Sequence, residues 1–223
     1  MTRTKLCDRA LPSYTRNEEL LNTLSHLLGV GLGVMVLAEC LSRAWAGGST
    51  AALVCGAVFG ISMILLYAVS GIYHGLRTHT AKKVFQVIDH CTIYLLIAGT
   101  YTPMLVCGLA KTAPVAAYIL LAVVWGCAIP AVTLTAIDLH RFRVFSMVCY
   151  IGMGWVILFS IEKMYMALGS HGFWLLLGGG ILYTVGAVLF RIGKRVPYFH
   201  TLFHVLVLAG SVLHAACVIL YLM

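Results

Sequence analysis

Charged residues are scarce in this sequence. Asp, Glu, Lys and Arg together make up 10% of its 223 residues, and only 7 residues are acidic. Soluble globular domains carry about 25% charged residues, and disordered chains are poor in apolar side chains. A chain with a mean hydropathy of +0.99 fits neither class. The composition therefore indicates an integral membrane protein.

The sequence also lacks the alternation of polar and apolar residues that marks the strands of a membrane β-barrel. Its apolar residues run continuously, over lengths near the roughly 20 residues that one membrane-spanning helix needs. Seven such stretches cover residues 24–43, 51–74, 85–107, 113–137, 144–162, 173–191 and 198–222. We therefore predict an all-α integral membrane protein with one seven-transmembrane helix bundle over residues 1–223. Residues 1–22 would form the short basic cytoplasmic N-terminal segment of this single domain.

Several well-known signatures are absent. None of the eight cysteines forms a C-x-x-C pair, so the sequence offers neither a disulfide framework nor a thiolate metal site. It has no H-E-x-x-H and no G-x-S-x-G motif. The basic start, the first apolar stretch and AWA at 44–46 resemble a signal peptide, but that stretch is too long for one. We therefore expect it to remain as a helix.

The 15 Lys and Arg residues are distributed unevenly along the chain. Twelve lie before the first stretch or in the second, fourth and sixth loops: Arg3, Lys5, Arg9, Arg16, Arg77, Lys82, Lys83, Arg141, Arg143, Arg191, Lys194 and Arg195. The other loops hold Arg43, Lys111 and Lys163. By the positive-inside rule, the N-terminus is cytoplasmic and the C-terminus outside, in the cell membrane. The net charge of +8 therefore predicts contact with membrane lipids, not with nucleic acid.

Ionisable residues inside membrane spans are costly, and they are candidates for function. Ser70 and His74 share one face near the end of the second stretch, and Asp89 lies near the start of the third. His200 and His204, one helical turn apart, open the last stretch. In the predicted topology all three places lie near the cytoplasmic surface. The polar residues are therefore expected to form one site there.

Three histidines plus water form a known catalytic zinc site. We predict that His74, His200 and His204 bind Zn²⁺. Asp89 would hold the water, and Ser70 would contact the water or the substrate. A Ser70–His74–Asp89 triad and a haem site are the alternatives, but the first lacks its usual motif. The second is disfavoured because two histidines on one helix face cannot sandwich a macrocycle.

Three further histidines lie in the apolar stretches. His26 enters the first stretch from the cytoplasmic side, which leaves an interfacial or a supporting role open. His90 is turned about 100° around the helix from Asp89, so a role shared with it is open too. His214 follows His204 by ten residues, about 15 Å along a helix, and is expected to make a separate packing or polar contact. Glycines at 29, 31, 33 and 178–180 are expected to permit close helix contacts.

Four strings resemble one known family. These are SGIYH at 70–74, DHCTIYLLIAGTYTP at 89–103, HTLFH at 200–204 and EELLNTLSH at 18–26. They are similar to the signature regions of the hemolysin III proteins, the bacterial branch of the progestin and adipoQ receptor family. The resemblance implies seven helices, a cytoplasmic N-terminus and a zinc ion held by residues that match His74, His200 and His204. The related alkaline ceramidases hydrolyse a lipid amide at a similar site.

The sequence thus favours a zinc-dependent membrane hydrolase that acts on a lipid amide or ester. One alternative is a signalling or membrane-homeostasis protein in which zinc only ties the helices together. A pore or transporter is disfavoured, because the polar residues cluster at one end of the predicted bundle. The sequence names neither the lipid substrate nor the oligomeric state.

Overall fold

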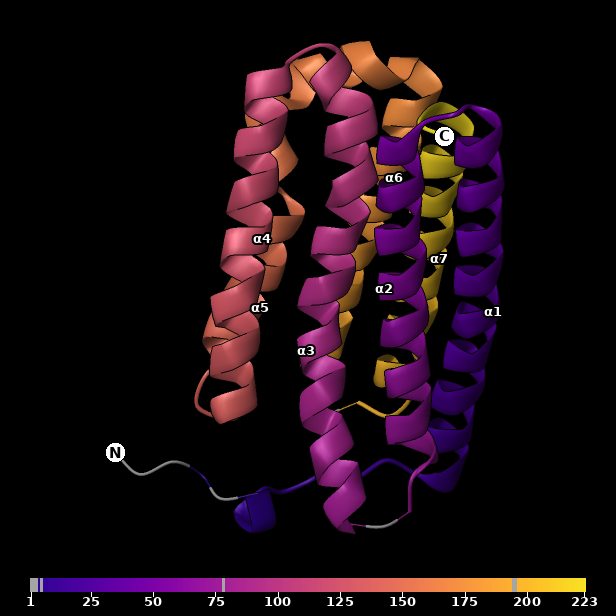
Figure 1. The fold of residues 1–223 in the computed structure, drawn as a ribbon. Coiled ribbons are helices and arrows are strands. Elements are labelled where there is room, and N and C mark those ends of the chain that lie inside the picture. The colour runs from indigo at the N-terminus through magenta and orange to yellow at the C-terminus, as the bar shows by residue number, and fades with distance from the viewer. Residues whose placement is uncertain (1–3, 5, 78, 194–195) are drawn as a thin grey trace.

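The computed structural model describes residues 4, 6–77, 79–193 and 196–223. Within these ranges the chain is helical and contains no strand. Its α-helices are α1 (Arg16–Ala46), α2 (Thr50–Gly75), α3 (His79–Pro103), α4 (Pro114–Ile137), α5 (Arg143–Gly154), α6 (Ile161–Ile192) and α7 (Phe199–Tyr221). Short turns of other helix types are η1 (Leu6–Asp8), η2 (Met104–Gly108), η3 (Leu109–Lys111) and η4 (Val156–Ser160). The long helices stand side by side in one bundle (Figure 1).

The predicted all-helical membrane architecture is confirmed, but the predicted count of seven spans is not. Six helical segments of the described chain are long and apolar enough to cross a membrane, and one of them is the merged stretch Arg143–Ile192. Within that stretch α5 has 12 residues, about 18 Å at 1.5 Å per residue. It is therefore too short to count as a span of its own. The helical run is broken again inside α6, where Gly169 has φ 66°.

The early end of α5 is stabilised by a side chain of α3. The hydroxyl of Tyr101 donates to the carbonyl of Gly154 at 2.7 Å and accepts from the backbone N–H of Ile157 at 3.3 Å. Backbone groups left open inside a membrane are costly unless a neighbour satisfies them. Tyr101 belongs to the string GTYTP, so this string supports the break between α5 and η4.

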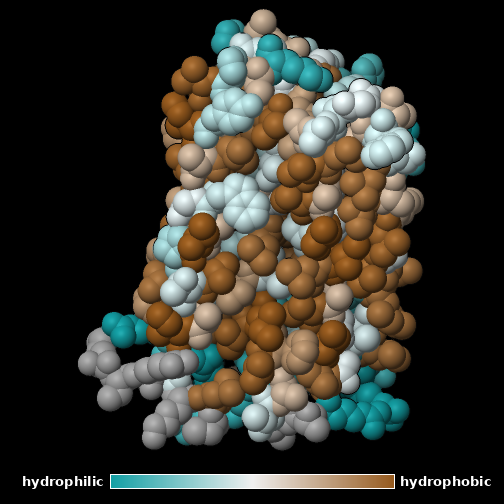
Figure 2. Space-filling model, in the orientation of Figure 1, coloured by the Kyte–Doolittle hydropathy of each residue, from teal (hydrophilic) through white to brown (hydrophobic). Residues whose placement is uncertain are grey.

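The outer surface of the bundle suits lipid. Strongly hydrophilic residues gather at the two ends of the face seen in Figure 2, and hydrophobic residues cover much of the length between them. Large apolar side chains such as Leu28, Val115 and Ile129 are more than half exposed. Exposed apolar area on this scale marks a surface that another apolar phase covers. Together with its apolar helices, this surface identifies a multi-pass membrane protein.

Glycines allow α1 and α2 to pack closely. The sequence predicted such contacts at three glycines of α1, and the structure confirms two of them. A Cβ at Gly33 would lie 3.0 Å from the backbone nitrogen of Ile64, and one at Gly29 would overlap the ring of Tyr67. At Gly31 an added Cβ would meet open space, so the prediction was wrong there. The close approach of these helices brings side chains from the start of α1 against the end of α2.

The segment before α1, residues 6–14, crosses one end of the bundle and is called the N-terminal strap below (Figure 1). Asp138, in the turn between α4 and α5, accepts a hydrogen bond from the backbone N–H of Thr4 at 2.9 Å. Burial opposes ionisation of Asp138, but the backbone N–H groups of Thr4 and Arg141 and the charge of Arg9 outweigh it and lower its pKa to about 2. The ionised carboxylate therefore anchors the chain just ahead of the strap.

Candidate metal centre

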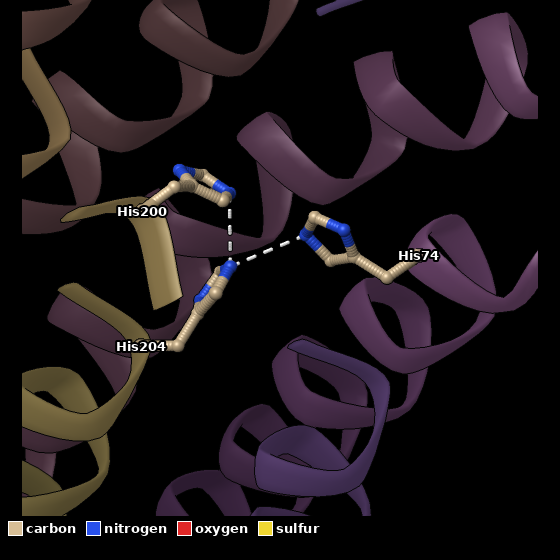
Figure 3. Close-up of side chains that lie close together, drawn as sticks. All are labelled: His74, His200 and His204. Carbon is tan, nitrogen blue, oxygen red and sulfur yellow. Dashed lines mark hydrogen bonds between the residues drawn. The ribbon is translucent and has the colours of Figure 1, made fainter. Parts of the chain in front are cut away.

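Three buried imidazoles converge at the end of the bundle that the strap crosses (Figure 3). His74 lies in the last turn of α2, and His200 and His204 occupy the first two turns of α7. The Nε2 atom of His204 is 2.9 Å from Nε2 of His200 and 3.2 Å from Nε2 of His74. The i, i+4 spacing puts the α7 pair on one face, and the close packing of the helices supplies the third ring.

A carboxylate on α1 fixes the ring of His74. Oε2 of Glu19 lies 2.7 Å from Nδ1 of His74, and its other oxygen accepts from the ammonium of Lys82 at 2.6 Å. A carboxylate only accepts hydrogen bonds, so Nδ1 carries the hydrogen. In the neutral ring, Nε2 of His74 then presents a lone pair to the shared centre. Carboxylates that orient a histidine in this way are common behind metal ligands.

A second histidine supports His204. Nδ1 of His204 lies 2.6 Å from Nε2 of His26, a buried residue of α1. When Nδ1 of His204 donates in this pair, its Nε2 also presents a lone pair to the centre. The hydroxyl of Ser70 lies 3.2 Å from the same nitrogen of His26. The sequence left the role of His26 open, and in the structure this residue contacts one of the three converging rings.

The donor set fits a metal ion. Lone pairs on the Nε2 atoms of His74 and His204, 3.2 Å apart, would repel each other without a cation or proton between them. Ligand nitrogens about 2.0–2.1 Å from a tetrahedral zinc ion stand about 3.3 Å from one another. The two Nε2–Nε2 distances from His204, 3.2 and 2.9 Å, are close to this spacing, and one nitrogen from each of the three histidines lies within 4.8 Å of the other two. The buried group of His74, His200 and His204 could therefore hold a metal ion.

Asp89 and Ser70 line the same cavity as His200 and His204. Asp89 lies on α3, where its Oδ2 atom is 3.8 Å from Nδ1 of His90. The alternative Ser70–His74–Asp89 triad is not formed, because the two nitrogens of His74 face Glu19 and His204. From the cavity wall, Asp89 and Ser70 would carry out the roles predicted for them.

The N-terminal strap covers this centre with an aromatic ring. Tyr14 stacks on His200, with ring centroids 4.6 Å apart and an angle of 17° between the planes. Burial raises the pKa of the Tyr14 phenol above its ordinary value, and the charges of Glu19 and Glu18 raise it further. Residues 10–14 also form part of the cavity wall. The strap therefore separates the three histidines from the space beyond the bundle.

The cavity has a volume of about 860 Å³ and runs between α3, α5, α6 and α7. Its wall includes His204 and Asp89 at one end, and apolar residues such as Ile97, Leu176 and Phe173 along its length. Pockets for small organic ligands measure about 300–1,000 Å³ and are mostly apolar. A buried polar end joined to an apolar space of this size suits a ligand with one reactive group and a hydrocarbon chain.

The sequence did not predict that Glu19 and Tyr14 contact the converging histidines. Glu19 matches a family string, and with Asn22 and His26 it recurs at i, i+3 and i+7, which is the period of one helix face. That period could have revealed it as a partner of the site. Tyr14 gives no such signal, because it lies outside a helix and reaches His200 only after the strap crosses the bundle.

The chain resembles known proteins over most of its length. A family described as Haemolysin-III related matches residues 14–215. The chain belongs to this haemolysin-III-related family. It is 40% identical to "Hemolysin-3" of Bacillus cereus over 206 residues, which are 92% of each chain. It is 37% identical to "Hemolysin-3 homolog" of Bacillus subtilis (strain 168) over 93% of this chain and 96% of the relative.

A more distant relative of this haemolysin-III-related protein is "Adiponectin receptor protein" of Drosophila melanogaster, 29% identical over 86% of this chain and 48% of the relative. The resemblance to the progestin and adipoQ receptor family is thus confirmed. Three of the four family strings open α1, close α2 and open α7. They supply the three converging histidines together with Glu19 and His26. The strings by which the family is recognised are therefore largely the residues of this centre.

Proposed function

We propose that this protein is a zinc-dependent hydrolase of a lipid amide or ester at the cytoplasmic leaflet of the cell membrane. The observation that supports this most is the buried group of His74, His200 and His204 beside an apolar cavity of about 860 Å³. Catalytic zinc sites use three protein ligands and keep one position open, whereas structural sites use four. The cavity would hold the acyl chain of the substrate.

The proposed reaction assigns roles to two residues of the cavity wall. Asp89 orients the attacking water and accepts its proton, because its carboxylate is an acceptor on the wall of the cavity. Ser70 donates its hydroxyl hydrogen to the water or to the carbonyl oxygen of the substrate. The water oxygen bonds to the carbonyl carbon, the C–N or C–O bond breaks, and the proton passes from Asp89 to the leaving amine or alcohol. A bound zinc ion would polarise the carbonyl and lower the pKa of its own water.

A second function is supported by a different observation. Glu19 and His26 of α1, His74 of α2 and His204 of α7 form one connected set of contacts. A metal ion in this set would tie the first, second and last helices together. In that case the protein would serve signalling or membrane homeostasis, and the zinc would be structural.

Turnover distinguishes the two functions. We expect the purified protein, reconstituted in lipid vesicles, to release fatty acid from a panel of fluorescent N-acyl amides and acyl esters. A chelator should abolish the release, and added Zn²⁺ should restore it, because the metal supplies the Lewis acid. Liquid chromatography of the released acid is the measurement. A protein that retains zinc and releases no acid from any member of the panel would favour the structural function.

The proposed site requires a particular orientation of the bundle. We propose seven crossings, with α5 and η4 together forming the fifth, a cytoplasmic N-terminus and the C-terminus outside. The uneven distribution of Lys and Arg supports this orientation. The start of α1 and the end of α7 also lie at opposite ends of the bundle (Figure 1), as an odd number of crossings requires.

Reporter fusions test this orientation. Alkaline phosphatase folds only outside the cytoplasm, so we expect activity when it follows Met223 and none when it follows His140. Green fluorescent protein fused at the same two places should give the reverse pattern. An inactive phosphatase at the C-terminus together with a fluorescent protein there would contradict the proposed orientation, and with it the cytoplasmic placement of the site.

A further inference from the structure

Two arginines line the cavity at the end of the bundle that the strap crosses. Arg143 is the first residue of α5, and Arg191 lies in the last turn of α6. Of the Lys and Arg residues that the structure describes, only these two form part of the cavity wall. The proposed reaction gives neither of them a role.

Helical spacing places Arg143 on the side of α5 that faces the cavity. Met147, Tyr150 and Gly154 follow it at intervals of four, three and four residues, and all three line the cavity. Residues at these intervals share one face of a helix. Arg143 is also exposed, so its guanidinium is accessible to a ligand at this end of the cavity.

The same spacing holds for Arg191 on α6. Ala187 and Thr184 precede it by four and seven residues and line the cavity as well. Arg191 is exposed, and it directly follows Phe190. The ring of Phe190 packs against His200, with centroids 5.7 Å apart. Arg191 therefore lies beside the metal centre.

Arg143 lies nearer to the end of the bundle than the proposed general base does. Tyr150 follows Arg143 by about 10 Å along α5, and its hydroxyl donates to the backbone carbonyl of His90 at 2.7 Å. His90 is the neighbour of Asp89 in the chain. From the end of the bundle inward, the cavity wall thus presents cations, then the carboxylate, then apolar side chains.

Neither arginine has a counter-charge in the protein. Among the described residues, no carboxylate lies within ion-pair distance of either guanidinium. Asp89 is the one acidic residue of the described cavity wall. Asp138, in the turn before α5, instead accepts from the backbone N–H groups of Thr4 and Arg141. A bound anion would therefore balance a positive charge that the protein leaves open.

We propose that Arg143 and Arg191 bind the phosphate of a lipid headgroup, so that the preferred ligand is an acyl lipid with a phosphate a few bonds from its acyl carbonyl. The proposal rests on the proposed function, which places the carbonyl at the metal centre and the chain in the apolar part of the cavity. Guanidinium groups form paired, charge-assisted hydrogen bonds with phosphate oxygens. The order of groups along the wall then matches the order of headgroup, carbonyl and chain in such a lipid.

Binding of matched lipids tests the proposal without turnover. An octadecenyl ether of glycerol and its 3-phosphate differ only in the phosphate, and neither can be hydrolysed as an ester. Both compete with a fluorescent glycerol ether for the zinc-loaded full-length protein in micelles of an uncharged detergent. We expect the phosphate-bearing ether to bind about tenfold more tightly, since charge-assisted hydrogen bonds are gained. Inorganic phosphate at the same concentration should not displace the probe, because it lacks the chain.

Glutamine variants locate the preference. Arg143→Gln and Arg191→Gln should each reduce the preference for the phosphate severalfold, and the double variant should bind both ethers alike. The matched control Arg141→Gln removes the same charge from an exposed residue outside the cavity wall. It should keep the preference, which separates a binding site from general attraction to a basic surface.

Three results would overturn the proposal. The first is equal affinity of the wild type for the two ethers, which is informative whether or not the variants fold. The second is a preference that persists in the double variant, since the phosphate would then bind elsewhere, as on the metal. The third is displacement of the probe by inorganic phosphate, which would indicate a site for a free anion. A protein that shows the preference and hydrolyses no lipid would support the headgroup site and contradict the proposed function.

Discussion

We expect the protein to contain about one zinc ion per chain, and replacing His74, His200 or His204 with alanine to remove most of it. One nitrogen from each of these buried histidines lies within 4.8 Å of the other two, so each variant would delete one third of the proposed protein ligands. Metal binding is coupled to folding, and each variant should therefore also unfold at a lower temperature. Elemental analysis of the purified variants and their thermal unfolding curves are the measurements.

Two further histidines serve as matched controls for the metal content. His214→Ala removes a buried imidazole of the same helix that lies well away from the centre, and it should leave zinc unchanged. His26→Ala removes the partner of His204 and should weaken zinc binding by about 10–100-fold without abolishing it. Full zinc occupancy in a His200→Ala, His204→Ala double variant would refute the site.

The variant Asp89→Ala should behave differently, keeping its zinc but losing turnover. In the proposed reaction Asp89 accepts a proton and does not bind the metal, and removal of a general base costs about 10²–10⁴ in rate. Asp89→Asn, which keeps the shape of the side chain but cannot accept the proton at neutral pH, should be nearly as slow. Hydrolysis of the lipid panel and zinc content, measured on the same preparations, separate chemistry from metal loss.

An acidic residue remote from the site provides the control for Asp89. Glu39 pairs with Arg43 on the exposed surface of α1, at a distance of 2.7 Å, and lies outside the cavity wall. Glu39→Gln should therefore hydrolyse lipid at the wild-type rate. Unchanged turnover in Asp89→Ala would contradict the proposed mechanism but not the proposed metal centre.

Residue spacing was sufficient to predict that His200 and His204 lie together, because they share a helix face whatever the rest of the chain does. Their meeting with His74 could also be predicted, since membrane topology restricts each helix end to one side. The side chains behind the group could not all be found in this way. Tyr14 reaches His200 through an irregular strap, and the path of such a segment depends on distant contacts such as that of Asp138.

The fold could be predicted in class but not in detail. Long apolar runs were enough to predict the helical membrane architecture. Hydropathy carries no signal for the break after Gly154, because that break depends on the hydroxyl of Tyr101 from another helix. The same limit applies to Gly31 and Gly33. Both are glycines in one apolar run, and only the packing of α2 decides that one is in contact and the other is not.

The division of the metal group between α2 and α7 has a consequence for biosynthesis. His200 leaves the ribosome 126 residues after His74, an interval of roughly 6–25 s at about 5–20 residues per second. Glu19 and His74 are both synthesised early, so the nascent chain can orient one ligand long before the other two exist. An ion held by the three histidines would be fully enclosed only when the last helix has entered the membrane. Metal loading would therefore be a late step, which would distinguish a completed chain from a truncated one.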